Sequence, residues 1–283
     1  MMPATLVGLD SLTARLPELR EQYRAAQPFP HIVLDGVLVP EAFTRAAAEF
    51  PPIGDAFWKG YLHVNETKYG NTQPDTWGET LAAVAKEFVS PDFVAFLEEL
   101  TGISDLLPDW SMDGGGLHQT LRGGHLNIHA DFTTHHINEN WSRRVNILLY
   151  LNDEWHEEWG GQLELWDTAM TAAQAKVQPA GNRMLVFTTS DDSFHGHPDA
   201  LTCPEDVARR SMALYYFTEG ARPVRKATNY RARPDETGLK RAAIALDRTA
   251  VDLYDRAKRK AGISDDQVSG VLERINKFRR PKG

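Results

Sequence analysis

A stretch of short apolar segments between residues 114 and 220 constrains the fold of this 283-residue chain more than any other feature. Residues typical of turns separate the segments, and the clearest of them span residues 144–151, 162–166, 183–188 and 211–218. Evenly spaced short strands are typical of a β-sandwich or β-barrel, whereas strands that alternate with long helices would indicate a parallel sheet. The sequence therefore predicts a mainly β core.

Helical patterns precede this region. Apolar residues recur there at helical spacing, and the expected helices span residues 9–23, 40–50, 76–89 and 91–101. A strand is predicted at residues 31–39, and residues 53–75 look irregular. Ser90 is expected to cap the helix that follows it, and Gly102 is expected to end that helix. Because these helices need an apolar partner, we expect them to pack on the core, which gives a mainly β fold with flanking helices.

The C-terminal segment is helical in pattern and basic. Residues 240–283 contain 12 Lys and Arg against 6 Asp and Glu, a local net charge of +6. Apolar spacing predicts one helix over about residues 246–257 and a second over about residues 264–275. A basic tail can bind a polyanion, but a solvated helical face is the simpler interpretation. We predict one domain over residues 1–230 and a basic helical extension over residues 231–283.

Composition narrows the class of protein. The net charge is −8, so no nucleic-acid partner is expected. No apolar run approaches the ~18 residues of a membrane helix, and the N-terminus lacks the features of a secretory signal. Cys203 is the only cysteine, which excludes an intramolecular disulfide and favours a reducing compartment. We expect a cytoplasmic monomer or homodimer with no membrane partner.

The first candidate site is the pair His129 and Asp131. On an extended segment, residues i and i+2 project to the same side, so an imidazole and a carboxylate could converge on one cation. The motif is short, and a single histidine in a strand is more often a structural, hydrogen-bonded residue. The pair becomes informative only together with further ligands.

Those further ligands lie downstream. His195 and His197 precede a strand that opens with Arg209, Arg210 and Ser211. Two histidines and one carboxylate on one face of a metal leave adjacent coordination positions open, a ligand set that suits oxygen-activating Fe(II) enzymes. Arginine offers a planar fork that matches a carboxylate. Strand alternation places Arg209 and Ser211 on one side and Arg210 on the other.

In these motifs the sequence resembles the Fe(II)/2-oxoglutarate-dependent dioxygenases of the prolyl 4-hydroxylase type. The resemblance runs from about residue 31 to residue 217. Its elements occur in the family's order and comprise His129-Ala130-Asp131, residues 143–152, 159–163 and 179–187, His195 and Arg209-Arg210-Ser211. The resemblance implies a double-stranded β-helix, or jelly roll, and an oxygenase domain within residues 1–230.

The resemblance also implies a site. Fe(II) would be held by His129, Asp131 and His195, and 2-oxoglutarate would chelate it, with O2 as the second cosubstrate and ascorbate as a stimulant. The remaining expected contacts of 2-oxoglutarate are Arg209 at its far carboxylate, Ser211 and Tyr150 as hydrogen-bond partners there, and Gln119 near the metal-bound end. His197 is the alternative to His195 as a ligand, and the family pattern favours His195.

The implied reaction is hydroxylation of an unactivated C–H bond with release of succinate and CO2. The substrate class stays open among an amino acid, a prolyl or other peptidyl residue and a small natural product. Residues expected to face the substrate are Arg143, His135 and His197. The alternative function is a metal-binding jelly-roll sensor or binding protein without turnover, and retention of the metal ligands and Arg209 favours the enzyme. A zinc hydrolase on a similar barrel would not explain Arg209.

Overall fold

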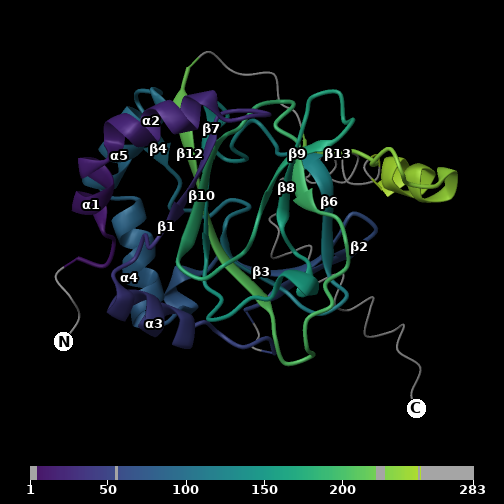
Figure 1. The fold of residues 1–283 in the computed structure, drawn as a ribbon, viewed down its shortest axis with the longest axis horizontal. Helices are drawn as coiled ribbons and strands as arrows, with labels where there is room; N and C mark the ends of the chain where they lie inside the picture. The colour runs from purple at the N-terminus through teal and green to yellow at the C-terminus, as the bar shows by residue number, and fades with distance from the viewer. Residues whose placement is uncertain (1–4, 55–56, 221–226, 248, 250–283) are drawn as a thin grey trace.

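The computed structural model describes residues 5–54, 57–220, 227–247 and 249 of the chain. One antiparallel sheet curls into a barrel-like body, and a layer of helices covers one side of it (Figure 1). The strand order is β1-β10-β7-β12-β5-β3-β6-β11-β8-β9, with β2, β4 and β13 attached at β3, β12 and β6. The prediction of a mainly β fold with flanking helices is confirmed.

Most strands lie in the segment that the sequence marked as β. They are β5 (Gly116–Thr120), β6 (His125–Ala130), β7 (Trp141–Tyr150), β8 (Leu163–Trp166), β9 (Ala173–Val177), β10 (Arg183–Thr188), β11 (His195–His197) and β12 (Arg209–Glu219), with β1 (His31–Asp35) and β4 (Leu107–Pro108) before them. The long strand β7 pairs with both β10 and β12. Sequence-distant strands are therefore neighbours, as expected when a sheet closes on itself.

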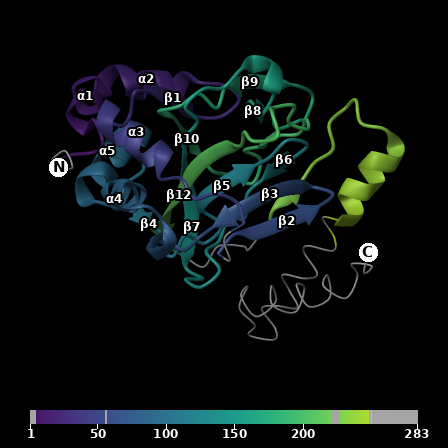
Figure 2. The same cartoon turned by 90° about the horizontal axis from the view of Figure 1, so that it is seen from below.

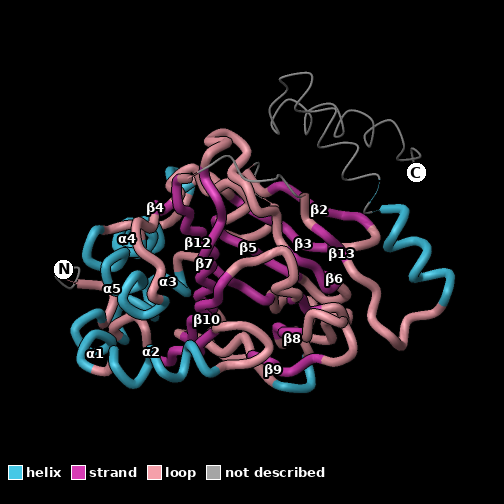
Figure 3. Tube along the Cα trace, turned by 90° about the horizontal axis from the view of Figure 1, so that it is seen from above, coloured by secondary structure: helices cyan, strands magenta, loops and turns pink. Residues whose placement is uncertain are grey.

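The helices form the second layer. They are α1 (Leu9–Ala14), α2 (Leu16–Ala25), α3 (Pro40–Ala48), α4 (Glu79–Phe88) and α5 (Pro91–Thr101), with short 3-10 turns at Pro74–Thr76 and Glu157–Trp159. Figure 3 shows α1–α5 gathered at one end of the molecule, away from the strands that enclose the opposite end. Their apolar faces meet alternate residues of β7, β10 and β12, such as Ile147, Val186 and Leu214, in one core. Because side chains alternate along a strand, the other faces of β7 and β12 are free to line an interior.

Three expectations for the helices have different outcomes. Ser90 accepts a hydrogen bond from the Phe93 amide at 3.4 Å, and Gly102 ends α5 in a left-handed conformation with φ 74°, as predicted. The single helix expected over residues 9–23 is wrong, because the chain forms two helices that meet at Arg15. Pro17 lies in the first turn of the second helix, where its missing N–H costs no hydrogen bond.

The segment at residues 53–75 is not irregular, which corrects the expectation from the sequence. It contains the hairpin of β2 (Lys59–His63) and β3 (Glu66–Asn71). Strand β3 lies between β5 and β6 and pairs with both of them, as Figure 2 shows. Its residues are largely polar, so the apolar alternation that identifies a strand is missing.

The described C-terminal residues contact the same sheet. Strand β13 (Asn229–Tyr230) pairs with β6, and residues 238–247 form a helix whose Ile244 is buried. The helices predicted beyond residue 249 lie outside the described residues. Within the described part of the chain, no helix is long and apolar enough to cross a membrane.

Candidate metal centre

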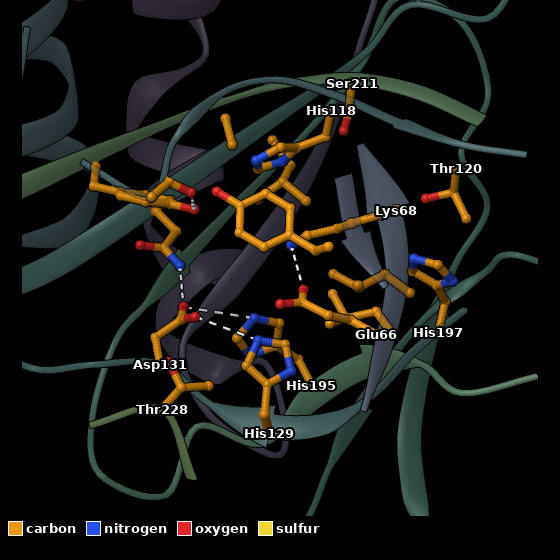
Figure 4. A pocket seen from close by; sticks show the side chains of 18 of the residues that line it. Glu66, Lys68, His118, Thr120, His129, Asp131, His195, His197, Ser211 and Thr228 are labelled. Carbon is orange, nitrogen blue, oxygen red and sulfur yellow. Dashed lines mark hydrogen bonds and ion pairs between the residues drawn. The ribbon is translucent and has the colours of Figure 1, made fainter. Parts of the chain in front are cut away.

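Three side chains that could hold a metal ion converge inside the barrel. His129 lies near the end of β6, Asp131 follows that strand directly, and His195 opens β11, where it is paired with His129. One potential ligand atom from each of the three lies within 4.8 Å of the others. Figure 4 shows the two imidazoles and the carboxylate turned toward one another. The predicted ligand set is thus brought together, and His197 is not part of the cluster.

Hydrogen bonds orient both imidazoles toward the shared point. Nδ1 of His129 lies 2.9 Å from the carbonyl oxygen of Asn127, and Nδ1 of His195 lies 2.9 Å from that of Ser193. Because a carbonyl only accepts, each Nδ1 carries the proton and each Nε2 is left with a lone pair. Burial lowers the pKa of His195 to about 4, against the opposing effect of Asp131. Two imidazoles that each direct Nε2 at the shared point, together with one carboxylate, fit a divalent iron site.

Asp131 is held on its other side by Asn146 and Arg143, both from β7. Asn146 donates to Oδ2 at 2.8 Å, and the Arg143 guanidinium forms an ion pair with Oδ2 at 3.0 Å. Arg143 also donates to the Asn146 side chain at 2.7 Å and stacks 3.3 Å from the Tyr215 ring centre. Burial alone would raise the pKa of Asp131, but Arg143 and His195 hold it well below its usual range. The carboxylate is therefore ionised, with Oδ1 left for a metal.

A cavity of about 190 Å³ extends from this cluster, and its lining includes both histidines and Asp131. A space of roughly 10–15 Å³ on this scale admits one water, so the cavity accommodates a small organic ligand. Arg209 also lines it, with only 4% of its surface exposed. Its Nε donates to the Gly161 carbonyl at 2.8 Å, and its Nη2 lies 3.3 Å from the Tyr150 hydroxyl.

Arg209 is a buried cation with only neutral partners among the residues that the structure describes. Burial lowers its pKa, and Tyr150 opposes that shift. A buried guanidinium of this kind is stabilised by an anionic ligand with two oxygens. The cavity therefore fits a ligand with a carboxylate at the Arg209 side and metal-binding atoms at the histidine side.

Strand alternation along β12 holds as predicted. Ser211, like Arg209, lines the cavity, whereas Met212 belongs to the apolar core on the opposite face. Arg210 also lies on that face, 5.5 Å from the Phe50 ring centre. Tyr150 is fully buried and reaches the site only through its contact with Arg209.

Two of the residues expected in the site lie elsewhere. Gln119 does not line the cavity, because its side chain donates to the Pro51 carbonyl at 2.8 Å on the other face of β5. Its neighbour His118 lines the cavity instead. His135 is 1% exposed and packs against Trp141, so it cannot face a substrate in this arrangement.

The other two expected substrate residues do line the cavity. Arg143 is 3% exposed, and its guanidinium forms an ion pair with the Asp131 carboxylate. His197 is buried, and its Nδ1 has no hydrogen-bond partner among the described residues. Burial, followed by the Arg209 guanidinium, holds the pKa of His197 well below its usual range.

Strands β3 and β13 contribute cavity residues that were not among the expected site residues. Glu66 and Lys68 of β3 and Tyr230 of β13 line the cavity, with Thr120 and His118 of β5 between β3 and Arg209. The Tyr230 ring lies 5.4 Å from the ring of His129. The i, i+2 spacing of Glu66 and Lys68 was the one available signal, and it was hidden in a segment without apolar alternation.

Comparison with known proteins agrees with this geometry. Residues 115–217 match the model of the 2OG-Fe(II) oxygenase superfamily. This segment is therefore similar to a superfamily whose members use Fe(II) as cofactor and 2-oxoglutarate and O2 as cosubstrates. The resemblance drawn from the sequence motifs is confirmed.

Individual relatives point the same way. A mouse prolyl 3-hydroxylase, OGFOD1, is 27% identical over 136 residues, which are 47% of this chain and 23% of the relative. The chain therefore spans about a quarter of the length of that protein. A Trichoplax adhaerens prolyl hydroxylase, solved with a peptide fragment of the hypoxia inducible factor oxygen degradation domain, superposes with a TM-score of 0.54. The two sequences are 16% identical, and the match covers 74% of this chain and 91% of the Trichoplax adhaerens chain. The fold is therefore the double-stranded β-helix expected from the motifs.

Proposed function

We propose that this protein is an Fe(II)- and 2-oxoglutarate-dependent oxygenase that hydroxylates an unactivated C–H bond and releases succinate and CO2. The observation that carries the proposal is a cavity that holds both a two-histidine, one-carboxylate cluster and a buried guanidinium without an anionic partner among the described residues. A metal-binding sensor would need the cluster, but it would not need a second anchor for a dicarboxylate.

Each residue has a defined task in this proposal. His129, Asp131 and His195 would hold Fe(II), which, when bound, would supply the centre at which O2 and 2-oxoglutarate react to oxidise the substrate. Arg209 binds the far carboxylate of 2-oxoglutarate, and Ser211 and Tyr150 contribute hydroxyl groups on the same side.

The surrounding residues keep the ligands in the required states. Arg143 and Asn146 hold Oδ2 of Asp131, so the carboxylate stays ionised and presents its other oxygen. The backbone carbonyls of Asn127 and Ser193 fix the tautomers of the two histidines. These supports leave little freedom for the ligands to rearrange when the cavity fills.

We propose a residue within a peptide, of the prolyl type, as the primary substrate. This choice is supported by the mouse relative, which is named a prolyl 3-hydroxylase, and by the peptide in the Trichoplax adhaerens structure. A free small molecule is the alternative. The oxygenase domain is proposed to span residues 1–230, with residues 231–283 as an extension. We propose a cytoplasmic monomer or homodimer without a nucleic-acid partner, consistent with the net charge of −8 and the single cysteine.

An anaerobic titration tests the proposal. Fe(II) and then 2-oxoglutarate are added to the apo-protein while the visible spectrum is recorded, with ascorbate present to keep the iron reduced. We expect a weak metal-to-ligand charge-transfer band that is absent in Asp131→Ala, followed by succinate formation when air is admitted. A wild-type protein without the band would refute the oxygenase assignment. A band without succinate would favour the sensor instead.

A further inference from the structure

Three neighbouring strands present a row of polar side chains to the cavity. Arg209 of β12 is paired with Thr120 of β5. Because Tyr69 is paired with Gln119 in the antiparallel β3–β5 ladder, Lys68 lies next to Thr120 on the third strand. Arg209, Thr120 and Lys68 all line the cavity. The row therefore has one cation at each end.

The Lys68 ammonium is fixed on the side of the metal ligands. Its Nζ lies 3.0 Å from Oε2 of Glu66. Glu66 also accepts a hydrogen bond from Tyr230, whose ring packs against His129. Figure 4 shows Lys68 and Glu66 meeting inside the cavity, with their side chains directed away from the strand that carries them. Lys68 and Arg209 therefore face different ends of a ligand that bridges the metal cluster and β12.

The Lys68–Glu66 pair is costly as a purely structural feature. The Lys68 side chain is 18% exposed and that of Glu66 is 11% exposed, and burying two charges often costs more than their attraction returns. An apolar pair of similar volume at these two positions would line the cavity without the desolvation penalty of two charges. Glu66 lies on one side of the ammonium, and the centre of the Tyr61 ring lies 5.6 Å from Nζ. Lysine has three N–H donors and one ion-pair partner among the described residues, so donors remain for an anionic ligand in the cavity.

His118 lies beside this ammonium and is neutral. Burial and the Lys68 charge lower its pKa to about 3. A Cβ placed on Gly70, its partner on β3, would lie 3.5 Å from the imidazole, so the ring packs against the glycine. A neutral imidazole next to an ammonium adds a hydrogen-bonding group without repelling a second carboxylate.

We propose that Lys68, with His118 beside it, binds the carboxylate next to the keto group of 2-oxoglutarate, while Arg209 binds the far carboxylate. The inference rests on the proposed function and deepens it. It assigns each end of the dicarboxylate to its own cation, carried by strands on either side of β5. A carboxylate of the primary substrate at Lys68 is the competing arrangement.

Three ligands distinguish binding at the two carboxylates of 2-oxoglutarate. 2-Oxoglutarate has both carboxylates, 2-oxopentanoate keeps only the one next to the keto group, and levulinate keeps only the far one. Affinities of the Fe(II)-loaded protein are measured anaerobically from the charge-transfer band for the two 2-oxo acids, and by competition for levulinate. We expect Lys68→Met to lower the affinity for 2-oxoglutarate and for 2-oxopentanoate by the same factor, on the order of tenfold to a hundredfold. The affinity for levulinate should not change.

Matched variants exclude a structural effect. Lys68→Arg keeps the cation and should retain most of the affinity, and Lys59→Met removes a lysine of the same hairpin that does not line the cavity. If Lys68→Met fails to fold, the double variant Lys68→Met/Glu66→Gln removes both charges and should show the same ligand pattern.

Two outcomes would overturn the inference. If Lys68→Met binds all three ligands with unchanged affinity, Lys68 serves the primary substrate or the fold. If the variant binds levulinate more weakly and 2-oxopentanoate with unchanged affinity, Lys68 contacts the far carboxylate. A wild-type protein that binds neither 2-oxo acid would refute the proposed function and this inference with it. The wild-type titration alone distinguishes that case from a failure of the Lys68 assignment.

Discussion

Replacing Arg209 by methionine should weaken ligand binding with little effect on the stability of the folded apo-protein. The variant loses two hydrogen bonds, to Gly161 and Tyr150, each worth about 1.5–3 kcal/mol for a charged donor. It also removes a buried cation whose desolvation costs several kcal/mol. Because the two terms oppose each other, we expect the free energy of unfolding to change by no more than about 1–2 kcal/mol.

The effect on the ligand is larger and follows from linkage. Loss of a charge-assisted contact worth about 2 kcal/mol lowers the affinity for 2-oxoglutarate roughly 30-fold. At a ligand concentration of 100 times the wild-type Kd, binding stabilises the wild-type protein by about 2.7 kcal/mol. The same concentration should stabilise Arg209→Met by only about 0.9 kcal/mol. Denaturant unfolding of the anaerobic Fe(II) form, with and without 2-oxoglutarate, measures both quantities.

Arg210→Met is the matched control. Arg210 is the next residue on β12, and its side chain lies near Phe50, on the side of the strand opposite the cavity. It should keep the full stabilisation by 2-oxoglutarate. If Arg209→Met responds to the ligand like the wild type, or if Arg210→Met loses the response instead, the assignment of the cavity-facing side of β12 is wrong.

Three further results are expected. The apo-protein should lose stability as the pH falls from 6.5 to 5, by about 1.4 kcal/mol per pH unit for each buried histidine. In this pH window the unfolded chain binds protons that the folded chain excludes, because burial lowers the pKa values of three histidines, His118, His195 and His197. If the free energy of unfolding, measured by urea denaturation, did not change with pH, these histidines would not be buried as neutral groups. Ser90→Ala should lower the free energy of unfolding by about 1 kcal/mol through the lost cap on Phe93, and an unchanged denaturation midpoint would exclude the cap. Gly181→Ala should be strongly destabilising because its Cβ would collide with the Asn152 carbonyl, whereas Gly220→Ala meets nothing within 4 Å; equal melting temperatures for the two variants would refute this packing.

The residues that the sequence could place are those joined by local geometry. His129 and Asp131 are two apart on one strand, and Arg209 and Ser211 are two apart on another, so alternation alone puts each pair on one face. Gln119 was expected only from the resemblance. The turn at residues 121–124 separates it from His129, so strand alternation does not relate the two side chains, and His118 lines the cavity in place of Gln119.

Strand β3 was missed for a different reason. A strand is recognised in a sequence when one face is apolar, and β3 presents Glu66 and Lys68 to a polar cavity. Its place between β5 and β6 depends on pairing with residues about 50 to 60 positions away, which no local pattern encodes. The property that makes the strand useful to the site is the one that hides it in the sequence.

The wall above the metal cluster comes from outside the segment that matches the superfamily model. Lys68 is positioned by Glu66, and Glu66 is held by His63 at 3.1 Å and by Tyr230. His63 is held in turn at 2.8 Å by Asp247, from the helix at residues 238–247. The matched residues 115–217 include the three candidate metal ligands and Arg209, whereas residues before and after them contribute other side chains to the cavity lining. Changes in β3 or the C-terminal helix should therefore alter which ligands are accepted while leaving metal binding in place.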